Sequence, residues 1–304
     1  MQQKQTQADE ENQTDQKYNT QLTKELKDKC LKLLRAYTKH DVVKITTSGD
    51  AAIFGALAIA KQRGIKTVLV PDQGGWLTYL TFPKILDMDI VELKTDYGLL
   101  VPSVLEKEAK RYSHCVLLFS SFAGYAAPQN ITDIANVCQK HQILMIEDAS
   151  GALGHDTLCN GTLSDIILGS FGKWKIADVG HGGFLSCKKG IITPEIKELD
   201  ILSLVQEKQM NYALLLEKLM RVPQRLASIF EKTKEIKTLC KKEHFDLIHE
   251  DAQGLSVFVR FHTDEEKEKI LAFCKTHHIE YKECPLYIKV LEKAISLEIK
   301  RMDL

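Results

Sequence analysis

The sequence predicts an α/β fold, in which a mostly parallel sheet carries helices on both faces and a small C-terminal α/β domain follows. Two observations lead to this fold class. Between about residues 45 and 190, short apolar runs alternate with longer amphipathic stretches, as in parallel sheets whose strands are buried on both faces. Beyond about residue 240 the chain again alternates between strand-like and helical patterns, over a much shorter length.

The composition is that of a globular protein without a bias toward charged partners. Of 304 residues, 44% are hydrophobic and 27% are charged. Lys and Arg total 41, as do Asp and Glu, so bulk electrostatics imply neither a nucleic acid nor an acidic membrane surface as partner. The longest apolar run, Ala51 to Ala60, is far shorter than the roughly 20 residues of a membrane helix.

Two further features predict a cytoplasmic protein. The N-terminus carries no charged and then apolar leader, so secretion is not expected. The eight cysteines are scattered singly, without a CxxC pair or a spacing typical of metal ligands. We therefore expect buried thiols in a reducing compartment, and no metal site.

The N-terminal region combines two patterns. Residues 1–17 contain no large apolar side chain beyond Met1, which predicts a disordered tail. Apolar residues then recur at helical spacing from Leu22 to Tyr37, which predicts an amphipathic helix to about His40.

A large domain is predicted over residues 18–192. Its buried strands are expected at residues 67–71, 90–93, 115–119, 143–146 and 166–168. Its helices are expected near residues 50–62, 77–87, 102–111 and 130–140. This alternation of strands and helices is the basis for the parallel sheet.

The remainder of the chain is predicted to form a connection and a small domain. Residues 193–240 are rich in Lys, Glu and Leu and predict connecting helices. A small C-terminal α/β domain is expected over residues 241–304, with an alternating strand at 255–261, a helix at 264–277, a strand at 279–283 and a final helix from about Leu286.

The most informative segment of the chain is Ser170 to Gly183, which reads SFGKWKIADVGHGG. It follows an apolar strand and ends in a Gly-rich return to another apolar run. Ligands of parallel sheets bind beyond the carboxyl ends of the strands, so Lys175 is expected near a bound ligand. A lysine amine attacks carbonyls, and pyridoxal phosphate (PLP) is the commonest carbonyl cofactor, so the segment suits a Schiff base. Lys173 is an alternative that spacing alone does not exclude.

The turn at Ser48-Gly49-Asp50-Ala51 opens a strongly apolar helix. Small residues allow close approach of a phosphate, and a helix N-terminus presents N–H groups and a positive dipole end to it. The alternative is a plain N-cap by Ser48 or Asp50. The Asp50 carboxylate would also have to point away from a phosphate.

An aromatic residue and an acid follow two other strands. Trp76 lies on a loop after a strand, where its indole could stack on a flat heteroaromatic ring; the alternative is a core or interface tryptophan. Asp148 ends a strand, where its carboxylate could keep a pyridine nitrogen protonated; the alternative is a cap of the next helix. Since neighbouring side chains of a strand point to opposite faces, only one of Glu147 and Asp148 can face the site.

These motifs together resemble the DegT/StrS-type aminotransferases, a branch of the fold type I PLP enzymes that mostly aminates keto sugars on nucleotides. The resemblance covers about residues 45–186. It rests on Ser-Gly-x-Ala-Ala at 48–52, Ile-Glu-Asp-Ala at 146–149, Ser-Phe-x-x-x-Lys at 170–175 and Gly-x-Gly-Gly at 180–183. It implies the large domain of a fold type I PLP transferase.

The same resemblance implies roles for individual residues. Because the lysine of this family lies five residues after the serine, Lys175 is favoured over Lys173 as the catalytic lysine. Asp148 would pair with the pyridine nitrogen and Trp76 would stack on the ring. The phosphate would be held by Ser170 and by the turn Ser48, Gly49, Asp50 and Ala51.

The implied reaction is an aminotransferase that moves an amino group from an amino acid donor to a keto acceptor, such as a nucleotide sugar, in a homodimer. Lys175 would act as a base, with its pKa lowered by a cationic cofactor or apolar walls. Alternatives remain open: another PLP reaction, such as dehydration or carbon–sulfur chemistry, or a non-catalytic PLP-binding or regulatory protein. The last is motivated by the shorter chain after residue 190 and by Gly151, which stands where the family usually has His or Gln.

Overall fold

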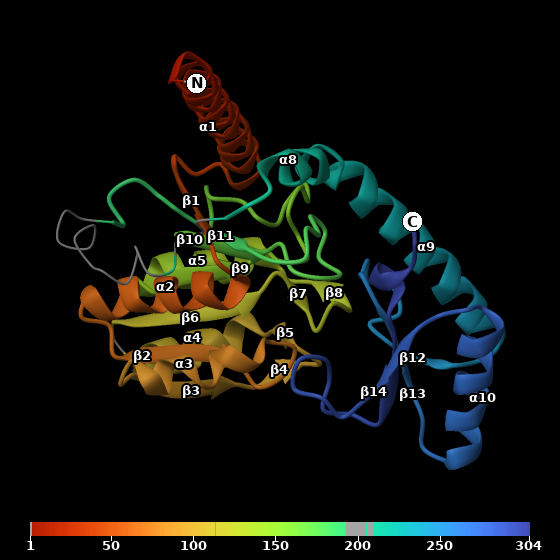
Figure 1. The fold of residues 1–304 in the computed structure, drawn as a ribbon. Coiled ribbons are helices and arrows are strands. Elements are labelled where there is room, and N and C mark those ends of the chain that lie inside the picture. The colour runs from red at the N-terminus through yellow and green to blue at the C-terminus, as the bar shows by residue number, and fades with distance from the viewer. Residues whose placement is uncertain (1, 113, 193–204, 206–208) are drawn as a thin grey trace.

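A computed structural model describes residues 2–112, 114–192, 205 and 209–304, and it confirms the predicted fold class (Figure 1). The main sheet has seven strands in the order β1-β11-β10-β9-β6-β2-β3. Their bounds are β1 Val42–Thr46, β2 Thr67–Pro71, β3 Asp89–Leu93, β6 Cys115–Ser120, β9 Leu144–Asp148, β10 Ile166–Ser170 and β11 Gly183–Cys187. Neighbours from β10 to β3 run parallel, and only β11 runs against the others.

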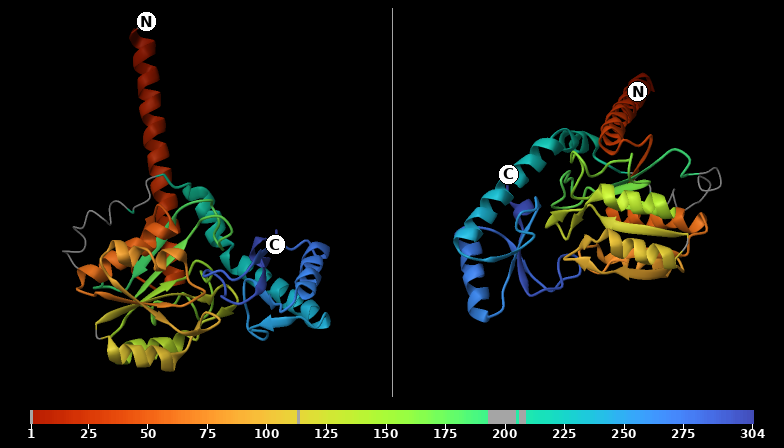
Figure 2. Two further views of the ribbon diagram at one scale, coloured as in Figure 1. Left: turned by 90° about the horizontal axis from the view of Figure 1, so that it is seen from below. Right: turned by 180° about the vertical axis from the view of Figure 1, so that it is seen from behind.

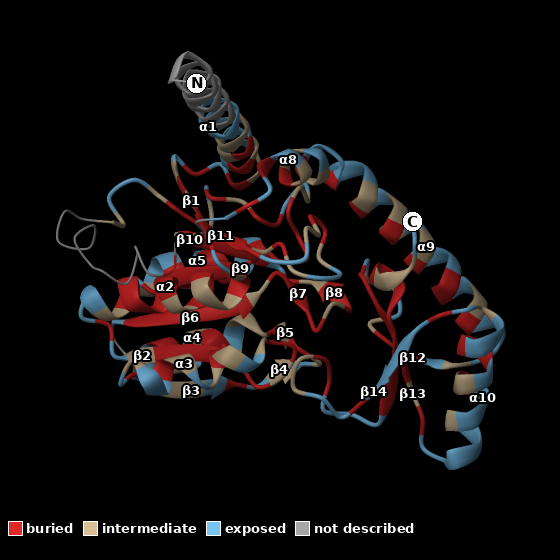
Figure 3. Ribbon diagram, viewed as in Figure 1, coloured by how far each residue is buried: buried red, intermediate tan, exposed pale blue. Residues whose placement is uncertain are grey.

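Helices cover both faces of this sheet because successive strand residues point to opposite sides. On one face, α2 (Gly49–Gln62), η1 (Leu77–Tyr79) and α3 (Phe82–Ile85) pack with strand residues such as Val68, Leu118 and Leu168. On the other face, α4 (Pro102–Arg111), α5 (Ile131–His141) and α8 (Tyr212–Met220) pack with strand residues such as Leu117 and Ile167. Figure 3 shows the central strands as almost wholly buried, which explains their continuous apolar runs.

All five strands that the sequence predicted for the large domain are present. The single helix predicted at residues 77–87 is instead divided into η1 and α3. The strand β1 was not predicted, and it adds an edge to the sheet by pairing with β11.

The N-terminal helix α1 spans Gln2–Thr38, so the structure differs from the disordered tail predicted for residues 1–17. Figure 2 shows its first turns projecting away from the sheet. The polar stretch contains no Gly or Pro and is rich in Gln, Glu and Lys, which are good helix formers. It can therefore extend a helix whose later turns are held by Cys30 and Leu34 in the core.

Part of the connection predicted for residues 193–240 lies outside the described residues, namely 193–204 and 206–208. The described remainder holds α8 and the long helix α9 (Val222–Lys242). The last residues form a four-stranded antiparallel sheet in the order β12-β13-β15-β14, covered by α9 and by α10 (Asp264–Thr276). Its strands are β12 Asp246–Ile248, β13 Val257–Arg260, β14 Tyr281–Glu283 and β15 Ala294–Leu297.

The final helix predicted from about Leu286 is wrong. The chain turns after β14, forms the central strand β15, and ends in the short 3-10 helix η2 (Ile299–Arg301). All four residues of β15 are buried. A strand buried on both faces loses the period-2 alternation that would have distinguished it from a helix.

Two short hairpins lie near the carboxyl end of the main sheet. They are formed by β4 (Thr95–Asp96) with β5 (Leu99–Leu100), and by β7 (Phe122–Ala123) with β8 (Ala127–Pro128). The second hairpin carries Tyr125 at its turn. No helix within the described ranges is both long enough and apolar enough to cross a bilayer.

Candidate active site

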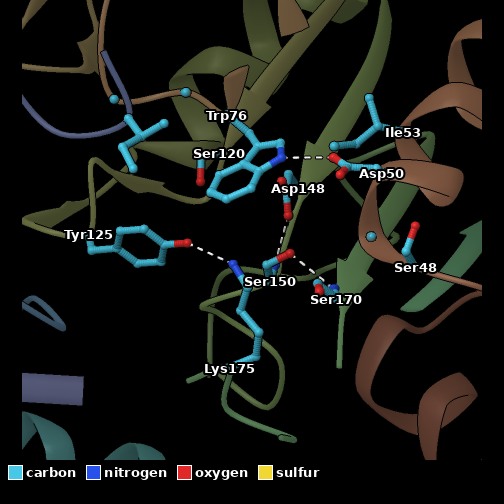
Figure 4. Close-up of a pocket in the computed structure, with 14 residues that line it drawn as sticks. Ser48, Asp50, Ile53, Trp76, Ser120, Tyr125, Asp148, Ser150, Ser170 and Lys175 are labelled. Atoms are coloured by element: carbon cyan, nitrogen blue, oxygen red, sulfur yellow. Dashed lines mark hydrogen bonds between the residues drawn. The ribbon is translucent and has the colours of Figure 1, made fainter. Parts of the chain in front are cut away.

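Nearly all the residues singled out in the sequence come together in one pocket at the carboxyl end of the parallel strands (Figure 4). Each element contributes a short piece: the start of α2, the loops after β2 and β6, and the ends of β9 and β10. The pocket is lined by Ser48, Gly49, Asp50, Ile53, Gly74, Gly75, Trp76, Ser120, Tyr125, Asp148, Ser150, Ser170, Lys175 and Ile288. Ala51 is not among the lining residues, and its N–H donates to Ser48 Oγ at 3.0 Å.

Lys175 reaches into the pocket from the loop between β10 and β11. Its Nζ donates a hydrogen bond to the hydroxyl of Tyr125 at 2.9 Å and lies 5.1 Å from the centre of the Trp76 ring. Lys173 is exposed, and its Nζ lies 4.5 Å from the centre of the Trp174 ring. Of the two lysines, the structure thus brings Lys175 to the pocket.

The pKa of Lys175 is raised, not lowered as the sequence suggested. Burial is the largest single effect and by itself lowers the pKa. Electrostatic interactions with Tyr125 and Asp148, together with the hydrogen bond to Tyr125, outweigh it. Without a ligand, the Lys175 amine is therefore held as a cation.

The start of α2 combines the two roles considered for it. Ser48 caps the helix through the hydrogen bond from Ala51, and the backbone of Gly49 lies against Ser170. A Cβ on Gly49 would be 2.6 Å from Ser170 Cβ, so only glycine lets the helix start meet the end of β10. The first turn of a helix has N–H groups without partners inside the helix, and here they open next to the Ser170 hydroxyl.

Asp50 is turned toward Trp76. Its Oδ1 accepts hydrogen bonds from Trp76 Nε1 at 2.8 Å and from Thr78 Oγ1 at 3.2 Å. In Figure 4, the Asp50 carboxylate points toward Trp76 and not toward Ser48 and Ser170. The carboxylate therefore fixes the indole and leaves the turn between Ser48 and Ser170 free of negative charge.

Asp148 is held rigidly at the end of β9. Its Oδ2 accepts from the hydroxyl of Tyr79 at 2.8 Å, and its Oδ1 accepts from the N–H of Ser150 at 2.9 Å. Tyr79 is fully buried, and burial, together with the charge of Asp148, raises its pKa well above the usual value, so it remains a neutral donor. Each carboxylate oxygen still has a lone pair for a further donor from the pocket.

Glu147 points to the other face of the sheet, as expected for its neighbour in a strand. It is fully buried and accepts from the hydroxyls of Ser121 and Ser164 and from the N–H of Cys159. Burial raises its pKa. Glu147 therefore belongs to the structural core, and Asp148 to the pocket.

Tyr125 is a lining residue with a contact to Lys175 that the sequence did not reveal, and Ser120 and Ile288 were likewise not predicted. Tyr125 occupies the turn of the β7–β8 hairpin with a positive φ of 75°, directly after Gly124. Neither its spacing nor its neighbours form a motif, and its place opposite Lys175 arises from the fold. The same region favours a glycine at position 151, since a Cβ there would lie 2.8 Å from Leu255 Cδ1 and in van der Waals contact with the Tyr125 ring.

Replacing Gly151 with Gln, as in the family pattern, is expected to destabilise the protein by about 1–3 kcal/mol, since overpacking forces neighbours to shift. Urea unfolding measures this. The matched test repeats the change in a Leu255→Ala background, where the nearest obstacle is gone and Gly151→Gln should cost less, relative to Leu255→Ala alone, than it does in the unaltered protein. Equal stability of Gly151→Gln and the unaltered protein would contradict the packing argument.

The side chains that the structure describes include no candidate metal-binding site. No group of three or more His, Cys, Asp or Glu residues there is placed to hold a metal ion. The eight cysteines are all buried and unpaired with one another.

Comparison with known proteins gives one partial family match and a clear structural likeness. Residues 227–304 match the MJ1341 family C-terminal domain, and no curated protein matches the sequence. Among solved structures, a variant of serine palmitoyltransferase from S. paucimobilis with a bound PLP–myriocin aldimine has a TM-score of 0.68 at 14% identity, covering 90% of this chain and 71% of that one.

Two further structures are similar. For 3-amino-5-hydroxybenzoic acid synthase the TM-score is 0.68 at 15% identity, with 90% of this chain and 85% of that one covered. For NtdA from Bacillus subtilis with bound cofactor PMP it is 0.67 at 13% identity, with 89% and 72% covered. These likenesses show that the chain has the α/β fold of the fold type I PLP enzymes.

Proposed function

We propose that this chain is a PLP-dependent aminotransferase related to the DegT/StrS type. It would move an amino group from an amino acid donor to a keto acceptor, such as a nucleotide sugar, and would act as a homodimer. The observation that carries the proposal is the placement of Lys175, Asp148, Trp76 and the start of α2 around one pocket.

The residues of the pocket fit this cofactor. Ser48, Ser170 and the backbone at Gly49 and Asp50 would hold the phosphate, since Gly49 and Ser170 form a close-fitting turn next to a helix N-terminus. Trp76, fixed by Asp50, would cover the ring. Asp148 would accept a hydrogen bond from the pyridine nitrogen with a lone pair that Tyr79 and Ser150 leave open.

When bound, PLP supplies an electron sink for negative charge at the substrate carbon. The chain's own residues supply the proton handling. Lys175 Nζ is placed to attach the cofactor and, once released, to take a proton from the substrate carbon and return it. Because its pKa is raised, Lys175 must first lose a proton, and the hydroxyl of Tyr125 is its hydrogen-bond partner for that step.

A different PLP reaction on the same scaffold is the second candidate. It is favoured by the likeness to serine palmitoyltransferase, whose name denotes an acyl transfer rather than a transamination. An amino acid that converts the cofactor to its aminated form distinguishes transamination from this alternative and from a non-catalytic PLP-binding protein.

The proposal is tested first by absorbance and by borohydride reduction. We expect the protein purified with PLP to be yellow and, after reduction and peptide mass spectrometry, to carry a pyridoxyl group on Lys175. A colourless protein that takes up no PLP would refute the proposed function. A pyridoxyl group on Lys173 would support the enzyme class but would show that Lys173, and not Lys175, carries the cofactor.

A further inference from the structure

A second cavity lies between α9 and the loop that joins β12 to β13; Figure 1 shows α9 beside β12. Its volume of about 330 Å³ is at the lower end of the range of about 300–1,000 Å³ that small-molecule sites occupy. The lining includes Phe230, Thr233, Lys234 and Lys237 from α9, and Glu250 and Asp251 from the loop. No lining residue is shared with the pocket around Lys175, so the two cavities are separate.

Thr233 presents a hydroxyl that the chain leaves unused. The residue is 1% exposed, and its Oγ1 has no hydrogen-bond partner among the described residues. Thr238, on the same helix, shows the common arrangement instead, since its Oγ1 donates to Lys234 O at 2.9 Å. Because a buried polar group without a partner costs free energy, the Thr233 hydroxyl points to a ligand in the cavity that it lines.

Lys237 lies four residues further along α9, on the same face of the helix as Thr233. It is 6% exposed, and its Nζ donates to His249 O and to Ala252 O, each at 2.6 Å. An ammonium group has three N–H donors, so one remains for a ligand. Within the described part of the chain, neither Lys237 nor Lys234 forms an ion pair with a carboxylate.

The two acids of the lining are paired with a different lysine. Glu250 Oε1 lies 2.6 Å and Asp251 Oδ1 lies 3.4 Å from Lys241 Nζ, and Lys241 also lines the cavity. With three lysines and two acids, the lining has one net positive charge. A ligand with a single negative charge would balance it.

We propose that this cavity binds the carboxylate of a small organic acid, between the hydroxyl of Thr233 and the free N–H of Lys237. A carboxylate has two acceptor oxygens for these two donors, and it carries one charge, whereas a phosphate monoester carries nearly two. Phe230 and Ala252 offer apolar surface to the body of the acid. This inference does not rest on the proposed function, because it concerns a separate cavity.

The charge of Lys237 makes this binding depend on pH. Burial is the largest effect on Lys237 and lowers its pKa to about 8. A carboxylate pairs with the cationic form, so affinity should fall as the pH rises through about 8. The other charged or titratable groups near Lys237 are Lys234, Cys240, Lys241, Glu250 and Asp251.

The test is calorimetric titration of the full-length protein with sodium benzoate, with uncharged benzamide as the control ligand. It is carried out on protein loaded with PLP and reduced with borohydride, and on protein that has not been loaded. We expect benzoate to bind saturably to both, and benzamide to bind at least about tenfold more weakly, since it lacks the charge. Binding is measured directly, so the result does not depend on uptake of PLP.

Thr233→Val keeps the shape of the side chain and removes only its hydroxyl. It should weaken benzoate binding by about tenfold, as loss of a hydrogen bond to a charged group does, without lowering the Tm of the ligand-free protein. The matched control is Lys232→Gln, since Lys232 lies on the same helix, pairs with Glu235 at 2.9 Å and does not line the cavity. It should bind benzoate like the unaltered protein.

Lys237→Gln should abolish the fall of affinity with pH. This variant also changes the contacts to the loop at His249 and Ala252, so Thr233→Val is the decisive one. Equal affinity in Thr233→Val and the unaltered protein, or no saturable binding up to about 10 mM benzoate, would overturn the site. Binding that disappears on loading with PLP would place benzoate in the pocket around Lys175 and would overturn it as well.

Discussion

Replacing Lys175 with alanine is expected to abolish covalent attachment of PLP and to reduce turnover by about 10²–10⁴-fold from the lost proton transfer alone. The reason is geometric, since Lys175 is the lysine that lines the pocket, and its Nζ donates a hydrogen bond to the hydroxyl of Tyr125. Absorbance of the loaded protein and single-turnover kinetics with an amino acid donor measure the two effects.

The matched control is Lys173→Ala, two residues away in the same loop. Lys173 is exposed and contacts Trp174, so its loss should leave both colour and turnover close to those of the unaltered protein. If Lys173→Ala loses the colour and Lys175→Ala keeps it, the assignment of the two lysines is reversed.

Replacing Asp148 with asparagine is expected to reduce turnover by about 10²–10³-fold, the usual cost of removing one preorganised electrostatic partner. In the proposed function the Asp148 carboxylate would hold a proton on the pyridine nitrogen, and an amide could not balance that charge. The measurement is kcat at saturating PLP, with PLP affinity determined separately.

The adjacent acid provides a control of the same kind. Glu147→Gln also changes a buried carboxylate that accepts hydrogen bonds on both oxygens, and each variant replaces one acceptor oxygen with an NH2 donor, so each should lose about 1 kcal/mol of stability. Only Asp148→Asn should lose turnover. Equal losses of turnover in the two variants would mean that stability, and not the ring nitrogen, explains the effect.

The sequence predicted best those strands that lie inside the main sheet and are covered by helices on both faces. The strand at Thr67–Pro71 has the predicted bounds because it is flanked by two strands and covered on both faces. Strand β1 was missed because Lys44 and Thr46 interrupt its apolar pattern. The end of the chain was assigned to a helix because all residues of Ala294–Leu297 are buried. The strand therefore lacks the alternation of apolar and polar residues that would have identified it.

The residues of the candidate site likewise fall into those that the sequence predicted and those that it did not. Ser48, Asp148 and Lys175 belong to short motifs fixed by local geometry, so their sequence spacing was informative. Tyr125 instead belongs to the site through the β7–β8 turn, and it meets Lys175, 50 residues further along the chain, only in the folded protein. A contact of that kind leaves no pattern in one sequence.

The turn that carries Tyr125 is joined to the C-terminal unit by backbone contacts. The N–H groups of Leu255 and Ser256 both donate to Tyr125 O, and a Cβ on Gly124 would lie 2.6 Å from Lys289 O. A displacement of the C-terminal unit is therefore expected to move this turn. The Tyr125 hydroxyl, which accepts a hydrogen bond from Lys175 Nζ, would move with it. The position of the C-terminal unit would thus control the hydrogen bond that Lys175 Nζ donates to Tyr125.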